Sequence, residues 1–211
     1  MKRRAVLFDL DGTLLDTLDD IADSMNAALA VLGQPVHPVE AYRFFVGDGV
    51  ETLARRTVAS GPSDEAAEAF RAEYARRWDK KTRPYDGIPE LLDALAGRGV
   101  GMAVLSNKPD DFTRMAVERY FPGAAFSAVR GMRPGGPKKP DPAAALDIAG
   151  GAGLEPAEFV YLGDTDTDMR TARAAGMHPV GALWGFRPAK ELLDNGAQEL
   201  LSAPRELLRF F

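Results

Sequence analysis

Four short polar motifs carry side chains whose types and spacing suit chemistry. In the first, Asp9-Leu10-Asp11-Gly12-Thr13, two carboxylates lie two residues apart directly after an apolar run. Like charges at this spacing resist joint ionisation unless a cation or hydrogen-bond donors compensate them. Gly12 permits a sharp backbone turn, and Thr13 adds a hydroxyl group. This motif therefore predicts a site for a metal ion and an oxyanion.

The other three motifs follow later apolar runs in the chain. They are Ser106-Asn107-Lys108, Lys138-Lys139-Pro140-Asp141-Pro142 and Gly163-Asp164-Thr165-Asp166-Thr167-Asp168. Ligands of open α/β sheets bind at the carboxyl ends of the strands, so we expect the four motifs to meet at one edge. Together they supply the groups that phosphoryl transfer needs: a carboxylate nucleophile, a carboxylate acid/base, ligands for Mg²⁺, and donors for the phosphoryl oxygens.

The apolar runs predict the strands that position these motifs. Five short runs lack the alternation of half-buried strands: residues 5–10, 100–105, 125–129, 159–162 and 179–183. Continuous apolar character is typical of strands buried on both faces. Helical patterns lie between the later runs, at residues 111–120, 141–149 and 167–175. This alternation predicts an α/β fold with a Rossmann-like parallel sheet.

Residues 16–83 follow a different pattern, with several helical stretches and no convincing strand. One amphipathic stretch ends at Gly33, and a second spans residues 65–78. We therefore expect a helical insert, residues 16–83, after the first strand. The α/β core would then be formed by residues 1–15 and 84–211.

Composition narrows the class of protein further. The chain has 211 residues, of which 45% are hydrophobic, enough for a proper core. Its net charge of -5, from 26 basic and 31 acidic residues, comes without a basic stripe, so we expect no nucleic-acid partner. Apolar runs are too short to cross a membrane, and Asp9 and Asp11 interrupt any signal-peptide pattern. We expect a cytoplasmic monomer or homodimer.

The four motifs and their order resemble the haloacid dehalogenase (HAD) superfamily, and the helical insert lies where that superfamily places its C1-type cap domain. Four longer sequence segments are similar to those of the phosphoglycolate phosphatase branch: Leu14-Leu15-Asp16-Thr17, Lys139-Pro140-Asp141-Pro142, Tyr161-Leu162-Gly163-Asp164 and Leu183-Trp184-Gly185-Phe186-Arg187. The resemblance implies Mg²⁺-dependent hydrolysis of a small phosphorylated metabolite through an aspartyl-phosphate. Among possible substrates, the resemblance favours 2-phosphoglycolate. Dehalogenases and phosphonate-cleaving members lack an acid at the position of Asp11, which favours a phosphate ester.

The resemblance also implies a role for each site residue. Asp9 would be the nucleophile and a Mg²⁺ ligand, and Asp11 the general acid/base, with its backbone carbonyl on the metal. Asp164 would bind Mg²⁺ directly, and Asp168 would bind it through water or orient the other ligands. The phosphate-binding group would comprise Thr13, Ser106, Asn107 and Lys139, with Thr13 and Asn107 supporting their loops.

Other functions stay open on the sequence. A phosphomutase of the β-phosphoglucomutase type would share the first step and pass the phosphoryl group to a sugar. A pyrophosphatase or nucleotidase would use the same site residues and differ only in the part of the substrate that the helical insert recognises. A non-catalytic binding protein could retain the same fold.

Some polar residues near the motifs have a second interpretation. Lys139 is preferred over Lys138 as the phosphate-binding lysine because it directly precedes Pro140, and Lys138 is then a solvated surface charge. Lys108 is expected to be a surface residue at the start of a helix, and a role in substrate binding is the alternative. Four acidic residues are expected to serve the start of a helix instead of a second metal: Asp16, Asp19, Asp20 and Asp23.

The aspartates of the fourth motif precede a predicted helix, where acidic groups suit the helix dipole. Asp166 is expected only to stabilise the start of this helix, whereas Asp164 and Asp168 can both stabilise the helix and bind a metal.

Polar residues of the helical insert also leave two interpretations open. The Gly47-Asp48-Gly49 turn either contacts the substrate or merely joins two helices. Arg55 and Arg56 either reach an anionic substrate group or lie on the surface.

Overall fold

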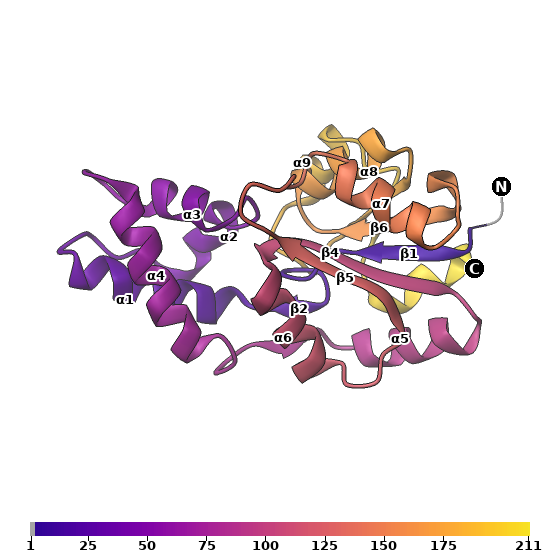
Figure 1. Ribbon diagram of the computed structural model, residues 1–211, viewed down its shortest axis with the longest axis horizontal. Helices are drawn as coiled ribbons and strands as arrows, with labels where there is room; N and C mark the ends of the chain where they lie inside the picture. Colours follow the sequence, from indigo (N-terminus) through magenta and orange to yellow (C-terminus); the bar gives the residue numbers. More distant parts are fainter. Residues whose placement is uncertain (1–2) are drawn as a thin grey trace.

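A six-stranded parallel sheet forms the centre of the α/β core in the computed structural model, which describes residues 3–211 (Figure 1). Its strands are β1 (Ala5–Phe8), β4 (Gly101–Pro109), β5 (Phe126–Met132), β6 (Phe159–Gly163), β7 (His178–Ala182) and β8 (Glu199–Leu201). The strand order is β5-β4-β1-β6-β7-β8, with parallel pairing throughout. The predicted α/β fold is confirmed. The five predicted strands are present, and β8 extends one edge of the sheet.

Both faces of this sheet are covered by helices, which explains the continuous apolar runs. The helices of the core are α5 (Ile88–Gly97), α6 (Asp110–Tyr120), α7 (Ala143–Gly151), α8 (Asp166–Ala175) and α9 (Ala189–Asp194). On one face Val6 and Phe8 of β1 pack in a cluster with side chains of α5 and α6, whereas Ala5 and Leu7 face α7 and α8. The predicted helices therefore form, with ends that shift by a few residues.

The helical insert packs around a hydrophobic cluster of its own. Its helices are α1 (Leu18–Val31), α2 (Tyr42–Phe45), α3 (Val50–Thr57) and α4 (Ser63–Arg77). Met25 and Leu29 of α1 are fully buried there, beside Phe70 and Tyr74 of α4. Gly33 adopts a φ of +65° just after α1, as the predicted helix end requires.

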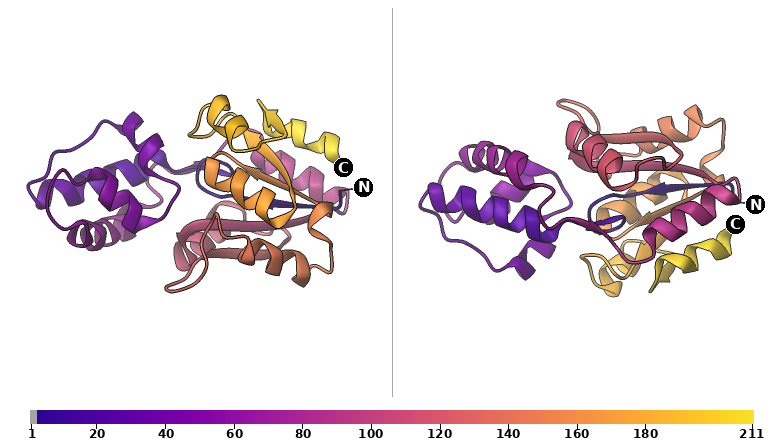
Figure 2. Two further views of the ribbon diagram at one scale, coloured as in Figure 1. Left: turned by 90° about the horizontal axis from the view of Figure 1, so that it is seen from above. Right: turned by 90° about the horizontal axis from the view of Figure 1, so that it is seen from below.

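Two short antiparallel strands connect the helical insert to the α/β core. They are β2 (Leu15–Asp16) and β3 (Arg83–Pro84). The insert therefore leaves and re-enters the core at one place, as the two turned views show (Figure 2).

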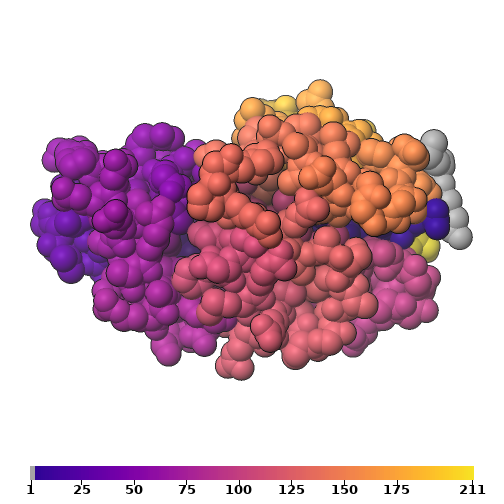
Figure 3. All heavy atoms as spheres, viewed as in Figure 1, coloured from indigo at the N-terminus to yellow at the C-terminus, as the bar shows by residue number. Residues whose placement is uncertain are grey.

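The insert lies against the carboxyl edge of the main sheet, and the two parts abut in the space-filling view (Figure 3). Hydrogen bonds cross between them: Arg43 donates to the carbonyl of Gly185 at 3.1 Å, and Arg187 donates to the carbonyl of Val46 at 3.0 Å. Of the helices in residues 3–211, none is long and apolar enough to span a membrane.

Candidate active site

The predicted motifs meet at the carboxyl edge of the sheet. β1 lies between β4 and β6, so Asp9 after β1 is flanked by Ser106 in the second half of β4 and by Asp164 after β6. Lys139 reaches the same place from the loop between β5 and α7. The topology thus brings together residues from all four motifs.

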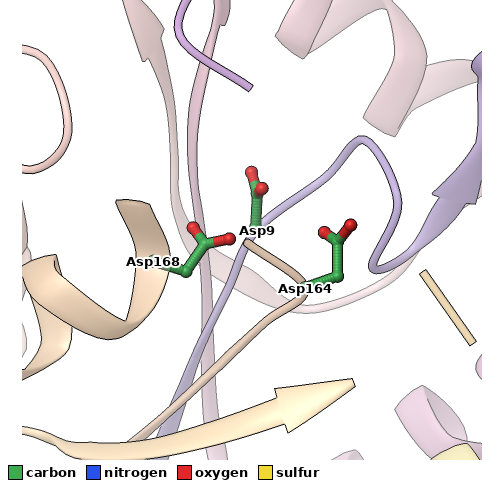
Figure 4. A group of neighbouring side chains, drawn as sticks. All are labelled: Asp9, Asp164 and Asp168. Atoms are coloured by element: carbon green, nitrogen blue, oxygen red, sulfur yellow. The ribbon is translucent and has the colours of Figure 1, made fainter. Parts of the chain in front are cut away.

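Asp9, Asp164 and Asp168 form an acidic cluster at this edge. One carboxylate oxygen from each lies within 4.8 Å of those of the other two. In Figure 4 the Asp168 side chain points toward Asp9, and the carboxylates of Asp9 and Asp164 point the same way. Asp9 is 5% exposed, and the other two are fully buried. Since Mg²⁺ prefers carboxylate oxygens, the donor set of this cluster fits that ion.

Burial makes the charges of this cluster costly without a cation. Burial, together with the charge of Asp168, raises the pKa of Asp164 to about 7. Burial and the same neighbour also raise the pKa of Asp9 well above its usual value, and Lys139 only partly offsets them. A divalent cation would supply the missing positive charge.

Lys139 supplies part of that charge from within the protein. Its Nζ lies 2.8 Å from Oδ1 of Asp9 and 2.7 Å from Oδ1 of Asp168. Burial lowers the pKa of Lys139, but Asp168 and Asp9 outweigh burial and raise the pKa well above its ordinary value. Lys138 is exposed, and its Nζ donates to the backbone carbonyl of Asp48 at 3.2 Å. Lys139, unlike the exposed Lys138, therefore lies at the acidic cluster.

The first motif holds Asp164 in place. The hydroxyl of Thr13 donates to Oδ1 of Asp164 at 2.9 Å, and the backbone N–H of Phe186 donates to Oδ2 at 2.9 Å. Gly12 has a φ of +85°, and a Cβ there would overlap the Asp164 carboxylate. Glycine is therefore required both by the backbone and by the close approach of the Asp164 carboxylate.

Asn107 joins the lysine loop to the helical insert. Its side-chain amide donates to the carbonyl of Gly47 at 3.0 Å and to that of Lys139 at 3.1 Å. Its oxygen accepts from the backbone N–H of Lys139 at 2.9 Å. Thr167 donates to Asp48 at 3.1 Å, so the turn between α2 and α3 packs on the carboxyl edge of the sheet.

Asp168 has a structural task as well. Its Oδ2 accepts from the backbone N–H of Thr165 at 3.0 Å and from the Thr165 hydroxyl at 2.7 Å, which completes a capping box at the start of α8. Asp166 lies in the first turn of that helix and pairs with Arg170 at 3.7 Å. Asp168 thus joins the acidic cluster and caps the helix, as the sequence allowed.

The expectation that Lys108 is a surface residue is wrong. β4 continues through Pro109, so Lys108 lies in the strand with its side chain 4% exposed. Its Nζ contacts Oδ1 of Asp11 at 2.9 Å and the hydroxyl of Tyr74 at 2.6 Å. Both partners are remote in the sequence, so no local signal marks this lysine as buried.

A cavity lies between the α/β core and the helical insert. It is lined from the core by Asp9, Asp11, Ser106, Asn107, Lys108, Pro109, Phe112 and Phe186, and from the insert mainly by apolar side chains of α1, α3 and α4. Gly47 and Gly49 also line it, whereas Arg55 and Arg56 do not. Arg56 instead pairs with Asp48 at 2.6 Å.

Known proteins resemble this chain over nearly its full length. The family model for haloacid dehalogenase-like hydrolases matches residues 6–182. A phosphoglycolate phosphatase of Pseudomonas savastanoi pv. phaseolicola is 33% identical over 213 residues, 97% of this chain and 78% of the relative. A phosphoglycolate phosphatase of Aquifex aeolicus is 33% identical over 206 residues, 98% of this chain and 95% of the relative.

The fold is shared with solved structures as well. A crystal structure of a protein from Lactobacillus delbrueckii subsp. bulgaricus has a TM-score of 0.92 and 31% identity, covering 98% of this chain and 97% of that one. The predicted superfamily is confirmed, and with it the prediction of an enzyme that is a hydrolase. The chain belongs to the family of haloacid dehalogenase-like hydrolases.

Proposed function

We propose that this protein hydrolyses a small phosphomonoester, 2-phosphoglycolate, in a Mg²⁺-dependent reaction through an aspartyl-phosphate at Asp9. The observation that carries the proposal is the acidic cluster of Asp9, Asp164 and Asp168 at the carboxyl edge of the sheet, in which Lys139 contacts both Asp9 and Asp168. The choice of substrate is supported by the names of the relatives that are 33% identical.

Asp9 is the nucleophile of the first step. One of its carboxylate oxygens forms a bond to phosphorus while the bond from phosphorus to the ester oxygen breaks. Protonated Asp11 gives its proton to the departing alcohol oxygen. Lys139 holds Oδ1 of Asp9 at 2.8 Å, which orients the nucleophile.

Water completes the cycle in a second displacement. Asp11, now a carboxylate, takes a proton from the attacking water, and the water oxygen bonds to phosphorus. The bond from phosphorus to Asp9 then breaks, which releases inorganic phosphate and regenerates the free carboxylate. Splitting one difficult displacement into two explains why a carboxylate is needed at Asp9.

The phosphoryl oxygens are held by the remaining site residues. Ser106 and Lys139 bind the phosphoryl group, and Thr13 and Asn107 support the loops that present them. Asp9, Asp164 and the backbone carbonyl of Asp11 would hold the metal, and Asp168 would bind it through water or orient the other ligands. When bound there, Mg²⁺ supplies positive charge that lowers the repulsion between the anionic nucleophile and the phosphate.

The helical insert acts in this proposal as a cap domain of residues 16–83 over a core domain of residues 1–15 and 84–211. Its hydrogen bonds with the core at Asn107 and Gly185 support this role. Opening at β2 and β3 would admit the substrate, and closure would exclude bulk water.

Phosphate release in the presence of Mg²⁺ tests the proposal. The kcat/KM values for 2-phosphoglycolate, pyrophosphate, sugar phosphates and nucleotides are compared, with EDTA as the metal-free control. We expect a preference for 2-phosphoglycolate beyond the roughly 10- to 200-fold that small differences in pocket shape give.

Other outcomes of the same assay contradict particular parts of the proposal. A flat profile would refute the substrate, and full activity in EDTA would refute the metal. Transfer of the phosphoryl group to an added sugar would favour a phosphomutase. No release from any compound would favour a binding protein.

A further inference from the structure

Lys108 is a buried cation beside the reacting groups, and the reaction proposed above gives it no role. Its side chain is 4% exposed, and its ammonium group contacts both carboxylate oxygens of Asp11, at 2.9 and 3.1 Å. The hydroxyl of Tyr74, from α4 of the helical insert, lies 2.6 Å away. The ammonium group also lies 4.8 Å from the centre of the Tyr74 ring.

The surroundings of Lys108 in the cavity are largely apolar. Ile21, Leu53, Phe70 and Phe112 are among the residues that line the cavity with it. The other cation in that lining is Arg71, whose side chain is 46% exposed and pairs with Glu51. Lys108 is therefore the buried cation of the lining, within the part of the chain that the structure describes. A charge in such a setting is stabilised only by an anionic or hydrogen-bonding partner.

We propose that Lys108 binds the carboxylate of the substrate and so selects phosphomonoesters of 2-hydroxy acids. This inference rests on the proposed function, in which Asp11 acts at the ester oxygen. In 2-phosphoglycolate a single methylene separates the ester oxygen from the carboxylate carbon. A cation that contacts the acid/base at 2.9 Å is therefore within reach of that carboxylate.

Tyr74 completes this anion site from the side of the helical insert. Because its hydroxyl contacts Lys108, it can donate to a carboxylate that the lysine binds. One group of the anion site comes from β4 of the core and the other from α4 of the insert. The two groups meet only while the insert lies against the core, so substrate selection and closure depend on the same contact.

The alternative is that Lys108 serves only to position Asp11. A positioning residue affects every phosphomonoester alike, because Asp11 acts on the ester oxygen in all of them. A carboxylate-binding residue affects 2-phosphoglycolate more than ethyl phosphate, whose tail is neutral. The ratio of the two kcat/KM values separates these roles.

The experiment compares Lys108→Met with Lys108→Arg and the wild type in the presence of Mg²⁺. We expect Lys108→Met to lower the ratio of kcat/KM for 2-phosphoglycolate to that for ethyl phosphate by roughly 10- to 100-fold, the contribution of a hydrogen bond to a charged group. Lys108→Arg should restore part of the ratio, and Lys190→Met, at an exposed lysine of α9, should leave it unchanged. Equal losses for both substrates would overturn the proposal.

Binding without turnover gives a second, independent readout. Calorimetry measures the affinity of the Asp9→Asn variant for 2-phosphoglycolate and ethyl phosphate, with and without Lys108→Met. We expect Lys108→Met to abolish the preference for 2-phosphoglycolate, and an unchanged preference would refute the carboxylate site. If the wild type shows no phosphatase activity while the Lys108-dependent preference persists, the hydrolytic function fails and the carboxylate site stands. If the wild type prefers 2-phosphoglycolate and Lys108→Met retains that preference, the carboxylate site fails and the hydrolytic function stands.

Discussion

Thr82 donates two hydrogen bonds to Oδ2 of Asp20, one from its backbone N–H and one from its hydroxyl, each at 2.8 Å. The backbone N–H of Lys81 donates to the same carboxylate at 3.0 Å. Asp20 lies in the first turn of α1, and Thr82 directly precedes β3. The two connections of the helical insert are thus tied to each other by one buried carboxylate.

Asp20→Ala should lower the free energy of unfolding by about 1–3 kcal/mol, because it leaves the buried donors of Thr82 without their acceptor. Urea denaturation followed by circular dichroism measures the change. Asp19→Ala in the same helical turn is the matched control, with an expected change below about 0.5 kcal/mol. Equal effects of the two substitutions would mean that Asp20 serves only the start of the helix.

Asp9→Asn should abolish turnover, with kcat lowered by roughly 10⁴-fold or more, which is the usual effect of removing a catalytic nucleophile. The thermal midpoint should be preserved or raised, since the substitution removes one of three clustered carboxylates. Phosphate release and thermal denaturation measure the two properties. Asp111→Asn, at an exposed position of α6, is the control. Activity of Asp9→Asn at the wild-type level would refute the nucleophile.

Gly12→Ala should weaken Mg²⁺ binding by roughly 10- to 100-fold, the usual effect of disturbing a group that orients a metal ligand. The reason is that the added Cβ would displace the Asp164 carboxylate. Gly99→Ala is a matched control, because Gly99 also has a positive φ, +69°, but nothing lies within 4 Å of its added Cβ. Calorimetric titration with Mg²⁺ measures the difference, and equal affinities in the two variants would contradict this view of Gly12.

The metal-free protein should lose stability as the pH rises from about 4 to about 7. The pKa of Asp164 is raised from 3.8 to about 7, so the folded state holds this proton more tightly than the unfolded chain. The resulting stabilisation is present at low pH and is lost as the pH rises through about 7. Thermal denaturation in EDTA measures this trend, which Asp164→Asn should reduce.

Mg²⁺ affinity should change in the opposite direction over the same range, because the metal competes with the proton for Asp164. Below pH 7 the affinity should fall by up to roughly tenfold per pH unit, the limit for one linked proton. Calorimetric titration at pH 6, 7 and 8 measures the slope. An affinity that is independent of pH would show that Asp164 is already ionised at pH 6.

The sequence predicted those features whose causes are local. Asp9 and Asp164 each follow a buried strand directly, so their shared edge follows from the parallel order of β1 and β6. The burial of Lys108 and the contacts of Asp20 with Thr82 could not be predicted. The partners of both residues come from distant segments that only the tertiary structure brings close. β8 has three residues, of which only Leu201 is buried, so its pattern was too short to read.

The pairing of β2 with β3 matches Leu15 with Pro84 and Asp16 with Arg83, the ladder that an ordinary β-hairpin would form. Residues 17–82 therefore take the place of a hairpin tip. A longer or shorter segment at that tip changes the entropy of closing the chain only slowly with its length. The part of the molecule that contributes Tyr74 to the cavity is in this sense exchangeable. We therefore expect that exchanging this segment changes the substrate preference while the proposed role of Asp9 in the α/β core is kept.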